Sequence, residues 1–336
     1  MMFSTMTSRA SAVRAAVIAM LPAFAACGDA PTATRSARGV DQLDDANAAF
    51  VCARCEKPIV FDASPANNSS ASHIYTVSPD GTGLTQLTFG VSKHMQPGWS
   101  ATYQQLVFVS DRYSPGKALQ VYTMNMKAGV IKRITYSGMA EHSPAFSADG
   151  KKITFVRNVP GGSKVVVINS DGSGEVVFPY GPSNLAPSFS PDGQRVIFSS
   201  LMHSTSGSEE AREIYMANVD GTNLKRITTD GLWNHNPVWT PDGTKLVFES
   251  YRGGADGIHK MNPDGSNIET LAMAAVGSGD WLGWSSVNAA STKVLFWTDM
   301  NGKDELRIVG INGGATTAVP LPASIEPGSA SWSFAR

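Results

Sequence analysis

A segment of about 47 residues recurs along the chain, and this repeat limits the possible folds more than any other feature of the sequence. Each copy is marked by an aromatic residue followed by Ser or Thr, and four copies have Pro two residues before the aromatic. The aromatic residues are Trp99, Phe146, Phe189, Trp239, Trp284 and Trp332. They lie 47, 43, 50, 45 and 48 residues apart. A period of this length indicates a repeat architecture in which every copy is one structural unit.

Each copy contains four short segments with the composition of β-strands, separated by Gly-containing turns. In the copy anchored at Trp99, the later segments are 105–108, 120–124 and 131–135. The second segment of every copy ends in Phe, at Phe61, Phe108, Phe155, Phe198, Phe248 and Phe296. Four antiparallel strands per period are the pattern of a β-propeller blade.

The first and last copies are each incomplete. The first begins at Ile59 with its Phe-containing segment and lacks the aromatic segment that should precede it. Residues 330–336 supply an aromatic segment with nothing after it. A C-terminal strand would complete the first blade and leave no unpaired sheet edge in the ring. The sequence therefore predicts an all-β, six-bladed β-propeller over residues 59–336, with its first blade closed by the C-terminal strand.

Asp-Gly pairs recur between the predicted strands. They begin at Asp80, Asp149, Asp171, Asp192, Asp220, Asp242 and Asp264. Gly supplies the positive φ of a tight turn, and Asp hydrogen-bonds the local backbone. A calcium loop would need several carboxylates within about a dozen residues and a closing Glu. We therefore interpret these pairs as turns.

The N-terminus has the pattern of a secretory signal. Arg9 and Arg14 precede the apolar residues 15–24, which are too few to span a bilayer as a helix. The sequence Phe-Ala-Ala-Cys at 24–27 resembles a bacterial lipobox, whose Cys is diacylated and becomes the first residue of the mature protein. We expect residues 1–26 to be a lipoprotein signal peptide. The alternative is an ordinary secretory signal with a coincidental Cys.

Residues 27–58 would then be a lipidated Cys27 with its tether, because 28–49 is polar and short of large apolar residues. By resemblance to lipoprotein sorting in enterobacteria, Gly28 favours the outer membrane, with the protein facing the periplasm. Removing the signal peptide takes away two Arg and no acid, so the net charge changes from −1 to −3. This charge predicts no nucleic-acid partner. We expect a monomer held at the membrane through its lipid only.

Cys52 and Cys55 are the other cysteines, two residues apart. In an oxidising compartment they could close a small disulfide ring, or they could remain free or pair with another chain. A zinc site would need two further ligands. A thioredoxin-like role would need a helix of a βαβ unit after the pair, and propeller sequence follows instead. We favour a disulfide and leave the thiol alternatives open.

Polar residues stand just before the aromatic segments. If these segments line the central channel, the polar residues should meet at one channel mouth. They are His94, Glu141, His142, Asn184, Asn234, His235 and Asp280. Imidazoles with a carboxylate would suit a divalent metal or a sugar. We prefer the alternative that they cap loop backbone groups and bind water, and we expect no cofactor.

Longer connections between the second and third strands lie on the same face as this mouth. They cover 110–119, 201–212 and 251–256. Loops on a rigid ring are a common place for recognition. Tyr113 and Tyr251 would supply aromatic anchors for a partner. Recognition should therefore occur on one face only.

The repeats resemble a known family. Pro-Ser-Phe-Ser-Pro-Asp-Gly at 187–193 and Pro-Val-Trp-Thr-Pro-Asp-Gly at 237–243 look like the WD40-like PD40 repeats of TolB-type periplasmic propellers. The resemblance covers residues 59–336. Proteins of the TolB type add an N-terminal α/β domain that engages the Tol machinery, and residues 27–58 are too few for one. Prolyl oligopeptidase-like enzymes share the repeats but carry an α/β-hydrolase domain, and no Gly-x-Ser-x-Gly motif occurs here.

These sequence features favour two functions. The first is a lipid-anchored propeller of the cell envelope that binds a protein or peptide and is not an enzyme. The alternative is a carbohydrate-active or metal-dependent propeller enzyme, a lyase or hydrolase, that uses the channel mouth.

Overall fold

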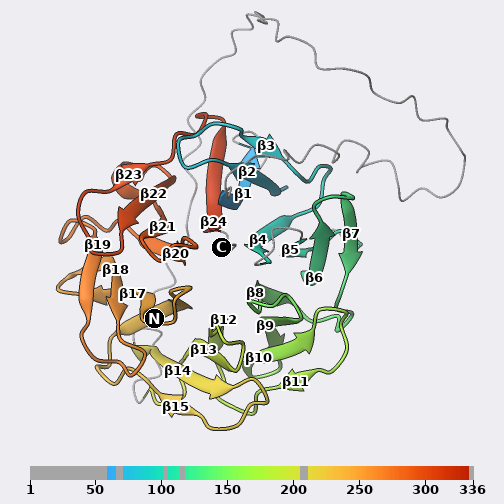
Figure 1. The fold of residues 1–336 in the computed structure, drawn as a ribbon, viewed down its shortest axis with the longest axis horizontal. Helices are drawn as coiled ribbons and strands as arrows, with labels where there is room; N and C mark the ends of the chain where they lie inside the picture. The colour runs from blue at the N-terminus through green and yellow to red at the C-terminus, as the bar shows by residue number, and fades with distance from the viewer. Residues whose placement is uncertain (1–58, 66–70, 101–104, 114–117, 205–210, 333–336) are drawn as a thin grey trace, which may run out of the picture. The chain divides into compact units, whose positions relative to one another are not determined.

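The computed structural model describes residues 59–65, 71–100, 105–113, 118–204 and 211–332. The described residues form six four-stranded antiparallel sheets, the blades, around a central axis (Figure 1). The predicted signal peptide, Cys27, Cys52 and Cys55 lie outside the described residues. Within the described ranges, no helix has the length and apolar character needed to cross a membrane.

Every blade has the same strand order from the channel outward. Blades 1 to 3 contain β24 (Ile325–Ser331), β1 (Ile59–Pro65), β2 (His73–Val77), β3 (Thr85–Gln86); β4 (His94–Trp99), β5 (Gln105–Ser110), β6 (Gln120–Asn125), β7 (Val130–Arg133); β8 (Glu141–Phe146), β9 (Lys152–Val159), β10 (Gly162–Asn169), β11 (Val176–Val177). Blades 4 to 6 contain β12 (Asn184–Phe189), β13 (Arg195–Ser200), β14 (Glu213–Asn218), β15 (Lys225–Arg226); β16 (Trp233–Trp239), β17 (Leu246–Arg252), β18 (Ala255–Met261), β19 (Glu269–Met273); β20 (Leu282–Val287), β21 (Lys293–Thr298), β22 (Glu305–Gly310), β23 (Thr317–Ala318). A 3₁₀ turn, η2 (Met300–Gly302), joins β21 to β22.

The core lies between neighbouring blades. The Phe residue predicted at the end of each second strand is fully buried in all six blades. Phe108, for example, packs in one cluster with Val60 and Ile74 of blade 1 and with Trp99 and Tyr122 of blade 2. Burying a Phe side chain contributes about 1.5–3 kcal/mol. These residues therefore form the repeated core. The prediction that each second strand ends at its Phe was wrong, because every one of these strands continues at least two residues further.

The ring closes as the sequence predicts. β24 pairs antiparallel with β1, with Ala330 opposite Phe61. Trp332 is buried, and its backbone N–H donates to Ser286 Oγ of blade 6 at 2.8 Å. The C-terminal strand therefore completes blade 1, and the chain end that follows it contacts blade 6 (Figure 1).

The inner strands share a β-bulge. In five blades the bulge residue has a left-handed backbone, and in four of these the next residue is Pro, whose missing N–H suits a position without a ladder bond. The left-handed residues are Gln96, Ser143, Ala186, Asn236 and Trp284. The predicted alignment of Trp284 with the core aromatics was wrong. Val287 pairs with Val294 as Trp239 pairs with Leu246, so Val287 is the true counterpart.

The two faces of the ring differ. The hairpin face carries the Asp-Gly turns, and the loop face is the side at which the inner strands begin. In the turns, Gly has positive φ and the Asp carboxylate accepts nearby backbone N–H groups, as Asp80 accepts that of Thr82 at 3.0 Å. Hydrogen bonds from the Thr82 hydroxyl and backbone lower the pKa of Asp80. The turn interpretation of the Asp-Gly pairs is confirmed.

Candidate functional site

A cavity of about 550 Å³ occupies the central channel. It extends from the bulges toward the hairpin face, and its lining includes Gln96, Asn236 and Trp284 together with Ser, Pro and Ala residues. No titratable side chain is among the described residues that line it. The predicted mouth residues do not line this cavity either, because they precede the bulges toward the loop face.

Four of the predicted mouth residues occupy one register position at the start of an inner strand. They are His94, Glu141, Asn184 and Asn234, and all are almost fully buried. Glu141 and Asn234 contact residues of the preceding blade, such as Thr135 and Glu213. Asn184 Nδ2 likewise donates to Ser163 O at 2.9 Å. The structure therefore brings these side chains into the junctions between blades.

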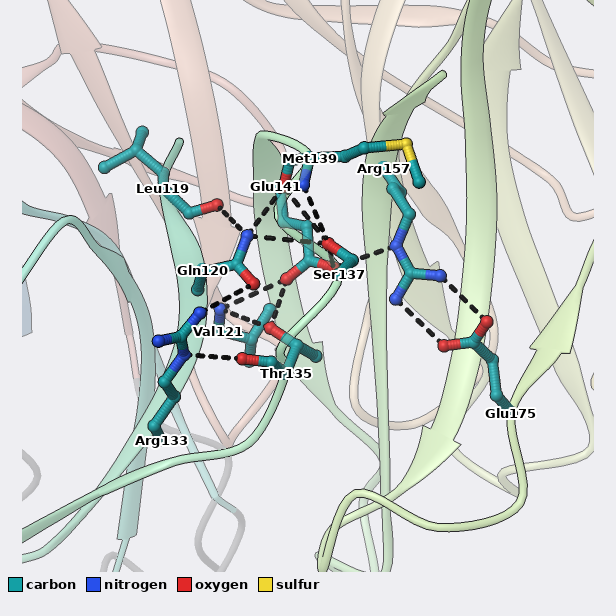
Figure 2. Close-up of polar contacts among 10 residues, drawn as sticks. All are labelled: Leu119, Gln120, Val121, Arg133, Thr135, Ser137, Met139, Glu141, Arg157 and Glu175. Atoms are coloured by element: carbon teal, nitrogen blue, oxygen red, sulfur yellow. Dashed lines mark hydrogen bonds and ion pairs between the residues drawn. The ribbon is translucent and has the colours of Figure 1, made fainter. Parts of the chain in front are cut away.

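Glu141 shows the chemistry of such a junction (Figure 2). Its carboxylate accepts hydrogen bonds from Arg157 Nε at 2.9 Å, Ser137 Oγ at 2.9 Å and the Thr135 hydroxyl. Arg157 also forms a bidentate pair with Glu175, with distances of 2.8 and 2.9 Å. Because this buried carboxylate has a cation and several donors, its charge is compensated where it lies.

The other three predicted residues do not share this register position. His142 Nε2 is 3.2 Å from Asn158 Nδ2, and Asp280 lies in the loop before β20. His235 stacks on Trp233 with ring centroids 5.0 Å apart. Burial, and then the nearby Arg212, lower the pKa of His235 to about 3. Among the described residues, no group of three or more His, Cys, Asp or Glu side chains is placed to hold a metal ion.

Two buried carboxyl groups that the sequence-based prediction missed flank the bulges. Asp62 of β1 and Glu249 of β17 each follow a buried core Phe. Each accepts a backbone N–H from the bulge of the next blade, Asp62 from Gln96 at 2.9 Å and Glu249 from Trp284. An acidic residue directly after the repeated Phe of a buried strand was the available sequence signal.

These two carboxyls lack the compensation that Glu141 has. Burial raises the pKa of Asp62 to about 6. Burial, and then the charge of Asp256, raise the pKa of Glu249 well above its ordinary value. Both pack against glycine, since a Cβ at Gly328 would lie 2.6 Å from Asp62 Oδ2 and one at Gly283 would lie 2.9 Å from Glu249 Oε2.

An aromatic patch lies on the loop face of blades 5 and 6. We define it as Trp233, Tyr251, Val276 and Trp281. Trp233 and Trp281 meet edge to face with centroids 5.6 Å apart, and Tyr251 is the cross-strand partner of Trp233. Val276 approaches Gly254, whose carbonyl accepts the Tyr251 hydroxyl at 3.0 Å. Tyr251, Val276 and Trp281 are all more than half exposed.

The patch belongs to a wider asymmetry between the two faces. Among the described residues, eleven large apolar side chains are exposed, and eight of them lie on the loop face. These eight are Val91, Tyr113, Tyr136, Met139, Tyr251, Met273, Val276 and Trp281. The predicted long loop at 251–256 was wrong, because β17 and β18 continue to a turn at Gly253 and Gly254. Tyr251 is nevertheless exposed on the predicted face.

Comparison with known proteins places the repeats in a family. The chain matches the family model of the TolB β-propeller domain, PD40, over residues 62–206 and 142–333. It is 27% identical over 175 residues to an uncharacterized protein of Agrobacterium fabrum, covering 49% of this chain and 57% of that protein. It is 27% identical over 134 residues to the TolB homolog of Chlorobium luteolum, covering 40% of this chain and 29% of that protein. The chain thus spans less than two thirds of these relatives' length.

Solved structures share the fold. TolB from Acinetobacter baumannii superposes with a TM-score of 0.69 at 18% identity, covering 82% of this chain and 66% of that chain. A putative TolB from Agrobacterium tumefaciens superposes with a TM-score of 0.61 at 17% identity, covering 79% of this chain and 90% of that chain. These likenesses concern the fold alone. Because the family model matches most of the sequence, the chain belongs to the TolB β-propeller (PD40) family.

Proposed function

We propose that this protein is a lipid-anchored scaffold of the bacterial cell envelope that binds a protein or peptide partner through its loop face. The observation that carries the proposal is the one-sided exposure of large apolar side chains, eight of eleven among the described residues. Aromatic and aliphatic anchors of this kind dominate the energetics of protein interfaces. Membership of the TolB β-propeller family supports the proposal that the propeller itself binds the partner.

The anchor is proposed from the N-terminal sequence. The signal-like residues and Cys27 favour lipidation and a place at the outer membrane, on the periplasmic side. Cells fed labelled palmitate should incorporate label into the wild-type chain and not into Cys27→Ala. Label that persists in Cys27→Ala, or is absent from the wild type, would contradict the anchor.

The binding face can be tested by site-specific photo-crosslinking. A photoreactive phenylalanine analogue would replace Tyr113, Tyr136 or Tyr251 on the loop face. Matched controls would replace Val130 and Ile268, which are exposed near the hairpin face. We expect a discrete crosslinked partner from loop-face positions only. Crosslinks of equal yield from Val130 and Ile268 would contradict recognition by the loop face.

The enzyme alternative would use ionisable groups or metal ligands near the channel. The described cavity lining contains no titratable side chain, and the carboxylate of Glu141 is already paired with Arg157. These observations favour binding over catalysis as the proposal to test first.

A further inference from the structure

The loop face carries a row of carboxyl groups beside the aromatic patch. We define the acidic arc as Asp256, Asp299, Asp304 and Glu326, which runs from blade 5 over blade 6 to blade 1. Among the described residues, no Lys, Arg or His side chain forms an ion pair with any member of the arc. The arc is therefore negative charge that the described part of the chain does not compensate.

The carboxyl groups of the arc are close enough to affect one another. Burial, followed by the charges of Glu326 and Asp299, raises the pKa of Asp304. Burial raises the pKa of Asp256 to about 6, and the charge of Asp299 adds to this rise. Like charges held together oppose ionisation, and a cation brought next to them relieves that repulsion.

The arc and the aromatic patch form one continuous surface. Asp299 Oδ1 accepts the backbone N–H of Trp281 at 2.6 Å. Asp256 is the cross-strand partner of Tyr251, and its Oδ2 accepts the backbone N–H of Leu282 at 2.8 Å. Asp256 is buried, so an occupant of the patch would meet the partly exposed Asp299 beside Trp281. Beyond Asp299 it would meet Asp304 and Glu326, which are exposed.

We propose that this surface docks a cationic segment of the partner, in which Lys or Arg residues flank a large apolar side chain. The proposal rests on the proposed function and specifies the chemistry of its partner. An acidic segment would be repelled by the arc, and a purely apolar one would bury carboxylates without partners. A segment with both features places its apolar side chain on Trp281 and Tyr251 and its cations on the arc, where indole faces also attract cations.

Among the described residues, blades 2 and 3 offer no such site on the loop face. Tyr136 already has the guanidinium of Arg133 over its ring, 4.5 Å from the centroid. Glu141 is paired with Arg157, and Lys93 is exposed nearby in the loop before β4. A cationic segment would thus meet occupied aromatic faces and positive charge over blades 2 and 3. We therefore place the docking site on blades 5, 6 and 1.

The probe is a synthetic labelled peptide, Gly-Ser-Lys-Trp-Lys-Leu-Lys-Ser-Gly, with a matched peptide in which Glu replaces each Lys. Binding to the purified chain is measured by fluorescence anisotropy at low and physiological salt. We expect the Lys peptide to bind and the Glu peptide not to bind. The affinity of the Lys peptide should fall at higher salt, because exposed charge contacts are screened.

Variants locate the site. Trp281→Ala should weaken binding of the Lys peptide about tenfold, and Asp304→Asn with Glu326→Gln about fivefold. All three residues are solvent-accessible, so the fold should be retained, which thermal melting checks. Tyr136→Ala is the matched control and should leave the affinity unchanged.

Three results would overturn the inference: equal binding of the two peptides, no loss in the arc variant, or an equal loss in Tyr136→Ala. These results leave the proposed function standing if crosslinks still form from the loop face alone. Crosslinks that form equally from the hairpin face would instead contradict the proposed function.

Discussion

Three junctions of the ring hold buried acids in two opposite ways. Between blades 2 and 3, Glu141 lies fully buried with Arg157 and a set of hydroxyl and backbone donors (Figure 2). At blades 5 and 1, Glu249 and Asp62 are nearly as buried, but the described donors to them are neutral amide and hydroxyl groups. The junction of Glu141 uses a charge to join blades, whereas those of Glu249 and Asp62 keep carboxyls whose ionised form is unfavourable.

This difference gives Glu141 a structural role and leaves Glu249 and Asp62 as groups that can gain or lose a proton. A carboxylate with a buried cation is part of the scaffold, because removing it leaves an uncompensated charge. A carboxyl with neutral donors tolerates loss of its charge, and its protonation changes with the surroundings. The acidic arc and the aromatic patch lie in the same half of the ring as Glu249 and Asp62, which is the half that we propose for recognition.

The largest effect is expected for Glu141→Gln. This change removes the charge that Arg157 Nε contacts and exchanges an acceptor of several hydrogen bonds for an amide. The free energy of unfolding should fall by about 3 kcal/mol. Glu175→Gln, which alters the exposed partner of Arg157, should cost at most about 1 kcal/mol. Urea denaturation of the two variants measures both values, and similar losses would contradict the structural role of Glu141.

The next effect concerns pH and Asp62. Its folded pKa of about 6 lies above the value of 3.8 that it has when unfolded, so the folded state binds the proton more tightly. Its ionisation therefore removes stability as pH rises from about 4 through 6, by up to about 3 kcal/mol. Asp62→Asn should abolish this loss.

The Asp62 prediction is measured as a difference, because buried histidines act in the same range. The pKa of His235 is lowered from 6.5 to about 3, so the unfolded state binds the proton more tightly. His235 therefore makes the free energy of unfolding fall as pH drops below 6.5. Subtracting the stability profile of Asp62→Asn from that of the wild type cancels this part. A difference that is flat between pH 4 and 7 would show that Asp62 does not titrate as proposed.

The repeat period was sufficient to predict the ring, the recurring Phe in the second strand of each blade and the closure by β24, because each follows from local pattern and pairing. Trp284 was misplaced because Gly-Trp-Ser repeats the local pattern of the core aromatics, while the pairing of Val287 depends on the bulge. Burial of Glu141 between blades depends on Thr135 and Arg157, which come from different strands. Likewise, nothing local distinguishes the exposed Trp281 from a core Trp.

A smaller effect is expected for Glu249→Gln, the matched change in the other half of the ring. Glu249 accepts from Asn236 Nδ2 at 2.6 Å and from a backbone N–H, and a Gln oxygen can accept both. Because no buried cation loses its partner, the free energy of unfolding at pH 7 should stay within about 1 kcal/mol of the wild type. A loss equal to that of Glu141→Gln would remove the distinction between the two junctions.

The smallest effect is expected on bound metal, and it compares one histidine from each half of the ring. His142 Nε2 of blade 3 lies 3.2 Å from Asn158 Nδ2, and His235 Nδ1 of blade 5 lies 3.9 Å from Glu249 Oε2. Each imidazole therefore has a polar neighbour within its own blade. A transition-metal centre would need several such ligands to converge on one ion. We therefore expect purified, dialysed protein to hold far less than one equivalent of metal, and His142→Ala with His235→Ala to leave that content unchanged. Stoichiometric metal that the double variant releases would show that the two halves meet at a shared centre, and it would move the enzyme alternative ahead of the binding scaffold.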